Sequence, residues 1–178
     1  MAHFEKQVES KTVYEGLIVD VRADIAELQN GRRVKREVVV HPGGVGIVPL
    51  TDDNKIIMVR QYRYCMEEEL IEIPAGKLEY GEDPFECAVR ELSEETNLRP
   101  SAADMVFFGR YHKTRAVHGE DWDVYYFVVR GVSEQGLEVY EGQGYKILYP
   151  TDDLDQINLT ILLRQVLADF FAAESKNE

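Results

Sequence analysis

The chain begins with a stretch in which apolar and polar residues alternate. Two such runs, residues 12–25 and 32–41, are separated by the dipeptide Asn30-Gly31. Alternation with a period of two is typical of strands that bury one face, and Asn-Gly is a strong hairpin signal. We therefore expect an antiparallel β segment at the start of the chain.

Strand patterns recur after this segment and are mixed with two helical patterns. Further strands are predicted at residues 41–50, 55–64, 105–112, 122–131 and 144–150. Apolar residues at three- and four-residue spacing predict helices at about residues 84–96 and 157–173. Strands outnumber helices and lack βαβ regularity, so an α+β sandwich fits better than a doubly wound sheet.

The first of the predicted helices has a well-specified start. Asp83 can cap it, Pro84 suits its first position, and Glu86 lies where a capping box places its acid. One apolar stripe should face the sheet, formed by Phe85, Ala88, Val89 and Leu92.

A second face of this helix is acidic. Glu91, Glu94 and Glu95 are spaced i, i+3 and i+4, and Glu82 lies just before the helix. One interpretation is a solvated acidic face. The other is a site where Arg90 or a divalent metal offsets the repulsion, and oxygen ligands without nearby His or Cys favour Mg²⁺ or Mn²⁺ over zinc.

Composition narrows the classes of partner. The 178 residues are 44% hydrophobic and 30% charged, with a formal net charge of -13. These values fit one globular domain with a short appendage, and the acidic balance argues against binding to nucleic acid or to an anionic membrane surface. Two cysteines outside any CxxC pair and a polar N-terminus lead us to expect a cytoplasmic protein.

The segment from Gly76 to Leu98 resembles the Nudix box, the signature of hydrolases that cleave nucleoside diphosphates linked to another moiety. The positions that match are Gly76, Glu82, Arg90, Glu91, Leu92, Glu94, Glu95 and Leu98. Asn97 replaces the glycine near the end of the box, and this departure is mild because asparagine tolerates the left-handed backbone that a helix-ending glycine supplies. The resemblance implies the Nudix fold, an α/β/α sandwich with a mixed sheet.

The resemblance also implies roles for individual residues. Metal ligands would be Glu91, Glu94, Glu95 and the backbone carbonyl of Ala75, with Mg²⁺ as cofactor and Mn²⁺ as a substitute. Arg90 would hold the glutamates in place by charge-assisted hydrogen bonds.

Outside the box, the chain is similar to the ADP-ribose pyrophosphatase and nucleoside diphosphate sugar hydrolase branch of the Nudix family. In that branch an N-terminal β segment helps to build a homodimer, which would assign residues 1–42 to dimerisation and 43–178 to the hydrolase domain. Arg36 and Arg63 match arginines that contact the substrate. The general base would be Glu141, in a Glu-Gly-Gln stretch, or Glu120, in a preceding loop.

The resemblance implies cleavage of ADP-ribose to AMP and ribose 5-phosphate. The chain lacks the proline that the branch usually carries beyond the box, and basic residues stand in that loop, His112, Lys113, Arg115 and His118. Other nucleoside diphosphate sugars such as GDP-mannose therefore stay open as substrates. A Nudix-fold module that binds ADP-ribose without cleaving it is the alternative from another class.

Overall fold

The structure is a computed structural model that describes residues 4–114 and 121–176. By its internal contacts the chain divides into two compact units. The first comprises Met1–Gly43 and His112–Asp123, and the second comprises Gly44–Tyr111 and Val124–Glu178.

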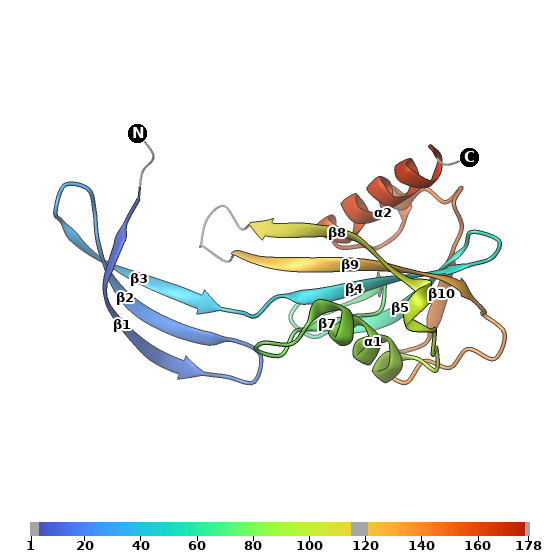
Figure 1. Cartoon of the computed structure of the whole chain (residues 1–178), viewed down its shortest axis with the longest axis horizontal. Helices are drawn as coiled ribbons and strands as arrows, with labels where there is room; N and C mark the ends of the chain where they lie inside the picture. Colours follow the sequence, from blue (N-terminus) through green and yellow to red (C-terminus); the bar gives the residue numbers. More distant parts are fainter. Residues whose placement is uncertain (1–3, 115–120, 177–178) are drawn as a thin grey trace. The chain divides into compact units, whose positions relative to one another are not determined.

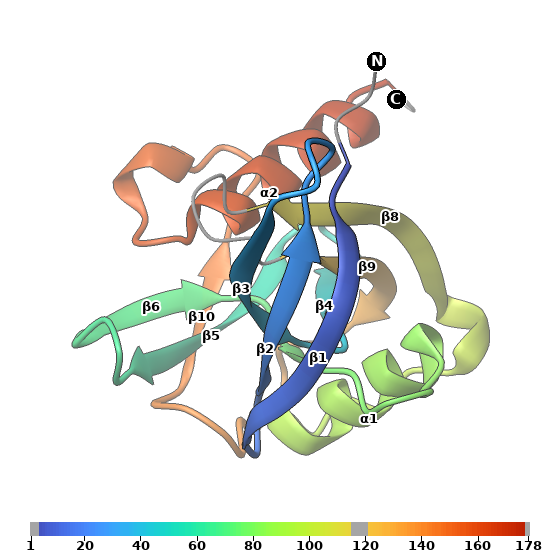
Figure 2. The same ribbon diagram turned by 90° about the vertical axis from the view of Figure 1, so that its left-hand side faces the viewer.

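The first unit contains a three-stranded antiparallel sheet in the order β1-β2-β3. Its strands are β1 (Lys6–Glu15), β2 (Asp20–Glu27) and β3 (Arg33–Val40), with β2 in the middle (Figure 2). Gly31 has a positive φ of 78°, and the Asn30 side chain accepts a hydrogen bond from the Arg32 N–H in the β2–β3 turn. The predicted N-terminal antiparallel segment and its Asn-Gly turn are confirmed.

The second unit is built on a seven-stranded mixed sheet. Its strand order is β10-β5-β4-β9-β8 (Figure 1), with β6 beside β5 (Figure 2) and β7 beside β4. Strand β4 runs parallel to β9 and antiparallel to β5 and β7. The strands are β4 (Gly44–Thr51), β5 (Ile56–Arg63), β6 (Glu68–Glu72), β7 (Ala75–Lys77), β8 (Met105–Thr114), β9 (Asp121–Val132) and β10 (Tyr145–Leu148).

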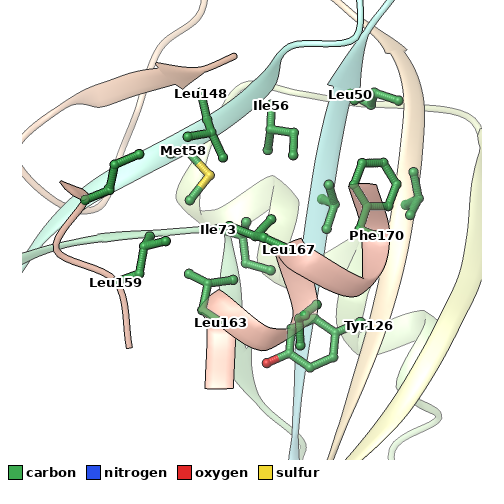
Figure 3. Packing of buried hydrophobic residues seen from close by; sticks show 14 residues of the cluster. Leu50, Ile56, Met58, Ile73, Tyr126, Leu148, Leu159, Leu163, Leu167 and Phe170 are labelled. Carbon is green, nitrogen blue, oxygen red and sulfur yellow. The ribbon is translucent and has the colours of Figure 1, made fainter. Parts of the chain in front are cut away.

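Two helices cover opposite faces of this sheet, α1 (Pro84–Glu95) and α2 (Ile161–Glu174) (Figure 1). The alternation along β4 divides the core, because Val45 and Ile47 pack with α1 whereas Val48 and Leu50 pack with α2. Figure 3 shows Leu163, Leu167 and Phe170 of α2 directed at the sheet residues. The predicted α/β/α sandwich with a mixed sheet is confirmed.

Both helices differ in detail from their predictions. Val89 does not face the sheet, since it is 40% exposed, and the buried Cys87 takes its place beside Ala88 and Leu92. The second helix begins at Ile161 rather than 157, because the Thr160 side chain caps it by accepting from the Leu163 N–H. Within the described ranges, no helix has the length and apolar character needed to cross a membrane.

Candidate functional site

The acidic face of α1 lies against strand β7, where Glu91 contacts Gly76 and Arg90 donates to the Lys77 carbonyl. Asp83 caps the helix by accepting hydrogen bonds from the N–H groups of Phe85 and Glu86, as predicted. Strand β7 follows β6 in sequence and pairs with β4, which lies in the centre of the sheet. The Glu91 carboxylate of α1 therefore lies beside a strand that is paired with the centre of the sheet.

Arg90 lies at the centre of these acids. Its guanidinium donates to both carboxylate oxygens of Glu82, at 2.9 and 3.0 Å, and its Nη1 donates to Glu91 at 2.7 Å and to Glu94 at 3.0 Å. It also donates to the Lys77 carbonyl at 3.2 Å. The hydrogen bonds from Arg90 lower the pKa of Glu82 to about 2, so this carboxylate is charged at any physiological pH. Arg90 thus ties the loop before α1 to the helix.

The carboxylate of Glu91 lies against the backbone of Gly76. A Cβ atom at position 76 would come within 1.8 Å of the Glu91 Cδ atom, so only glycine leaves room for this carboxylate. Burial raises the pKa of Glu91, and the neighbouring Arg90 opposes that rise. The glycine that opens the box is therefore explained by the space that Glu91 needs.

Glu95 is the most buried of the helix acids, at 5% exposure. Burial is the main cause that raises its pKa to about 8, a hydrogen bond from the Ala75 backbone opposes the rise, and the charges of Glu91 and Glu141 add to it. Its Oε2 atom is buried and has no hydrogen-bond partner. Such an oxygen is costly to bury, which points to a ligand that satisfies it.

The loop that carries Glu141 is hydrogen-bonded to α1 on one side and to β5 on the other. On one side the Tyr140 N–H donates to the Glu95 carbonyl at 2.8 Å. On the other side the Gln143 side chain accepts from the Tyr62 N–H at 2.7 Å. Gly142 has a φ of 98°, and a Cβ there would lie 2.4 Å from the Arg60 carbonyl oxygen. These hydrogen bonds hold the Glu-Gly-Gln stretch in place, with Glu141 within electrostatic range of Glu91 and Glu95.

Arg63, at the end of β5, also belongs to this group. Its positive charge acts to lower the pKa of Glu95, and its guanidinium forms a two-bond ion pair with Glu72. Sequence analysis did not single out Glu72. The sequence could have pointed to Glu72 through its spacing of two residues from the apolar Leu70 in β6, which places both side chains on one face of the sheet.

Three other residues were predicted from the sequence for this site, Glu94, Arg36 and Glu120. Glu94 is exposed and contacts Arg90. Arg36 belongs to the other compact unit, where it pairs with Glu5 at 2.8 and 2.9 Å. Glu120 lies outside the described residues, as do Arg115 and His118.

Asn97 does not adopt the left-handed backbone that asparagine would tolerate here. Asn97 is not among the residues with positive φ, and α1 ends instead on an extended Thr96. The Asn97 side chain donates to the Gly136 carbonyl at 2.7 Å and accepts from the Glu138 N–H at 3.0 Å. Asparagine here fastens the loop that leads to Glu141 to the end of α1.

The acids of this site suit a hard divalent cation. Among the residues that the structure describes, no three acidic, thiol or imidazole side chains stand in a ready metal-binding arrangement, and Arg90 holds both Glu91 and Glu94. The unpartnered, buried Oε2 of Glu95 nevertheless offers the oxygen donor that Mg²⁺ prefers. The donor set fits such an ion, with Glu91 and Glu95 as its most buried members.

Comparison with known proteins identifies the family. The sequence model of the NUDIX domain matches residues 40–170. The chain belongs to the Nudix family. The model of the nucleoside diphosphate sugar hydrolase N-terminal domain matches residues 5–39 of this Nudix protein.

Several curated proteins are similar to this Nudix chain over part of their length. It is 50% identical over 92 residues to the methanol dehydrogenase activator of Bacillus methanolicus, covering 52% of this chain and 50% of that protein. It is 48% identical over 92 residues to an ADP-ribose pyrophosphatase of Bacillus subtilis (strain 168), with the same coverage. A Mycobacterium tuberculosis ADP-ribose pyrophosphatase is 42% identical over 100 residues, covering 56% and 48%. The chain spans about half the length of the curated relatives it matches.

A solved structure supports the fold. The crystal structure of an ADP compounds hydrolase superimposes with a TM-score of 0.69 at 22% identity, covering 96% of this chain and 92% of the other. At this identity the likeness concerns the Nudix fold alone.

Proposed function

We propose that this Nudix protein hydrolyses the diphosphate linkage of a nucleoside diphosphate sugar, with ADP-ribose cleaved to AMP and ribose 5-phosphate. The observation that carries the proposal is the buried carboxylate of Glu95, with its unpartnered oxygen, within electrostatic range of Glu91, Glu141 and Arg63. The relatives named ADP-ribose pyrophosphatase support the choice of substrate.

The residues that would hold Mg²⁺, or Mn²⁺ in its place, are Glu91, Glu94, Glu95 and the carbonyl of Ala75. When bound, the ion supplies charge neutralisation for the diphosphate and makes a bound water more acidic. Arg90 keeps Glu91 and Glu94 in position by direct hydrogen bonds.

The remaining chemistry is assigned to protein side chains. Arg63 binds the diphosphate through its guanidinium. Water attacks one phosphorus, the bond from that phosphorus to the bridging oxygen breaks, and the proton of the water passes to a carboxylate. We assign that proton to Glu141, because its loop is fastened at both ends, and Glu120 is the alternative base.

A substrate panel tests the proposal. With Mg²⁺ present, ADP-ribose should yield AMP and ribose 5-phosphate, measured by chromatography of the products. GDP-mannose, UDP-glucose, NADH, coenzyme A and a dinucleoside polyphosphate complete the panel. Turnover of none of them would contradict the proposal, and tight binding of ADP-ribose without cleavage would establish the non-cleaving module instead.

A second candidate function rests on the Bacillus methanolicus relative. Because the chain is 50% identical to a methanol dehydrogenase activator over 92 residues, it is a candidate activator of a dehydrogenase. Adding the chain to purified methanol dehydrogenase should raise the rate of alcohol oxidation if this candidate is correct.

The N-terminal unit supports the proposal of a homodimer. Strand β1 is the edge of its sheet, all ten of its residues are exposed, and they include the apolar Val8, Val13 and Tyr14. We assign residues 1–42 to dimerisation and 43–178 to the hydrolase domain. Sedimentation of a chain lacking residues 1–42 should show a monomer or an unfolded protein.

A cytoplasmic location stays a prediction that cell fractionation can test.

A further inference from the structure

Arg63 forms its ion pair with Glu72 and not with Glu68, the acid opposite it in the sheet. The β5–β6 register pairs Arg63 with Glu68 and pairs Val59 with Glu72, four residues back along β5. Residues directly opposite each other in an antiparallel pair share one face and lie close together, so the register alone would pair Arg63 with Glu68. The Arg63 guanidinium instead reaches back to Glu72, with Nε–Oε1 at 3.2 Å and Nη2–Oε2 at 2.6 Å.

The Arg63–Glu72 pair differs from an ordinary surface pair. The Glu72 side chain is only 12% exposed, whereas Arg63 is 41% exposed. On the same two strands, Arg60 and Glu69 approach only to 3.8 Å and are 43% and 45% exposed. A buried carboxylate is costly unless it is fully bonded, and a two-bond contact to arginine is the geometry that satisfies it. Glu72 is therefore the mostly buried member of the pair, and Arg63 is the more exposed member.

The pairing sets the direction of the guanidinium. Its Nε and Nη2 edge faces Glu72, so the planar group presents its Nη1 edge elsewhere. Arg63 is close enough to Glu95 for its charge to act on that carboxyl. The ion pair with Glu72 thus fixes the Arg63 guanidinium within electrostatic range of Glu95, beside the acids where the proposed substrate would place its diphosphate.

We propose that Glu72 is a positioning residue, which holds Arg63 oriented for the diphosphate of a nucleoside diphosphate sugar. The proposal rests on the function proposed above. It predicts that the carboxylate of Glu72 matters through Arg63, and that the carboxylate of Glu68, the register partner of Arg63, does not.

The test compares Glu72→Gln with the matched variant Glu68→Gln in the full chain. We expect Glu72→Gln to lower kcat/KM for ADP-ribose about 10- to 100-fold, mainly through KM, because a displaced binding group loses affinity and alignment. Glu68→Gln should stay within about twofold of the wild type. Glu72→Asp, which keeps the charge on a shorter side chain, should recover part of the loss.

A double-mutant cycle separates positioning from a general loss of structure. Arg63→Ala and the double variant Arg63→Ala/Glu72→Gln should have the same kcat/KM, since Glu72 acts through Arg63. Additive losses would overturn the proposal. Thermal unfolding of each variant identifies a folding defect, and if Glu72→Gln does not fold, the comparison of Glu72→Asp with Glu68→Asp takes its place.

Calorimetric titration of ADP-ribose, with Ca²⁺ in place of Mg²⁺, distinguishes failure of this proposal from failure of the proposed function. If the wild type hydrolyses ADP-ribose and Glu72→Gln behaves as Glu68→Gln, positioning by Glu72 is wrong and the function stands. If the wild type binds without hydrolysis, a weaker affinity in Glu72→Gln alone still supports positioning. Unchanged or tighter binding in Glu72→Gln, or no binding by the wild type, would overturn it.

Discussion

The two helices of the second unit cover the same sheet from opposite sides and do so with different chemistry. α2 buries Leu163, Val166, Leu167 and Phe170, which contact apolar residues of β4, β5 and β9. α1 buries Cys87, Ala88 and Leu92, but it also buries the carboxylate of Glu95. The buried residues of α2 are all apolar, whereas α1 combines apolar packing with a buried acid.

This difference separates stability from chemistry. Burying an ionisable group with an unpartnered oxygen destabilises a folded chain, whereas burying apolar side chains stabilises it. The apolar side formed by α2 offsets the cost on the α1 side. Substitutions on α1 should therefore change activity more than stability, and substitutions on α2 should do the reverse.

The largest effect is expected for Glu95→Gln. The amide removes a charged oxygen donor at nearly constant volume, so the rate of ADP-ribose hydrolysis should fall roughly a thousandfold, which corresponds to about 4 kcal/mol of transition-state stabilisation. The protein should stay folded by circular dichroism. Glu86→Gln, at an exposed site in the first turn of the same helix, is the control. Near wild-type turnover of Glu95→Gln would show that α1 has no special role in the chemistry.

The next effect is the opposite one, for Leu167→Ala on α2. Leu167 is fully buried, so its truncation should lower the free energy of unfolding by about 2–5 kcal/mol. The kcat of the protein that remains folded should be unchanged, since no atom of α2 belongs to the acidic site. Denaturant titration and initial rates check both parts. A Val89→Ala control on the exposed face of α1 should change the unfolding free energy by less than about 0.5 kcal/mol.

A smaller effect is expected at the end of α1, for Asn97→Gly. This substitution restores the glycine of the Nudix box but removes two hydrogen bonds to the loop at 136–138. The free energy of unfolding should fall by about 1–2 kcal/mol. Asn97→Ala should lose a similar amount, because the backbone at this position does not need a left-handed conformation. A glycine variant as stable as the wild type, with a less stable alanine variant, would contradict this account.

The features of α1 that the sequence could predict are the local ones. The acidic face, the Asp83 cap and the spacing of the box follow from local helical geometry, and each was predicted. The exposure of Val89 was not, because the rotation of α1 depends on its contacts with β7, where Arg90 reaches the Lys77 carbonyl. Spacing alone defines a stripe to within about one residue of the true buried face.

Features that depend on pairing between distant segments were also not predictable. Gly142 needs a positive φ and has no room for a Cβ atom, because it lies against the Arg60 carbonyl oxygen. Glu72 bonds to Arg63 although the β5–β6 register places it opposite Val59, four residues back along β5. A sequence shows that these residues exist but does not show which strand lies beside them. The candidate site was thus predicted on α1 and left incomplete on β5 and β6.

The last effect concerns pH and arises from two acids on the α1 side of the sheet. The pKa of Glu95 is about 8 in the folded protein against 4.5 for the free group, so between these values the folded state binds more protons than the unfolded state. Stability from this group is therefore present below pH 4.5 and lost as pH rises through 8. Glu82 behaves in the opposite way, since its pKa of about 2 makes its contribution present above pH 4.5 and lost as pH falls toward 2.

Thermal unfolding without divalent cations measures the effect of Glu95. The Tm of the wild type should fall by roughly 6–12 °C between pH 5.5 and 8.5, relative to Glu95→Gln, in which this group no longer titrates. Saturating Mg²⁺ should raise the wild-type Tm more at pH 8.5 than at pH 5.5, because a metal ligand must be deprotonated. Leu167→Ala should lower Tm at every pH without changing the slope relative to the wild type. If Leu167→Ala altered the slope and Glu95→Gln did not, the division between an apolar α2 side and a charged α1 side would fail.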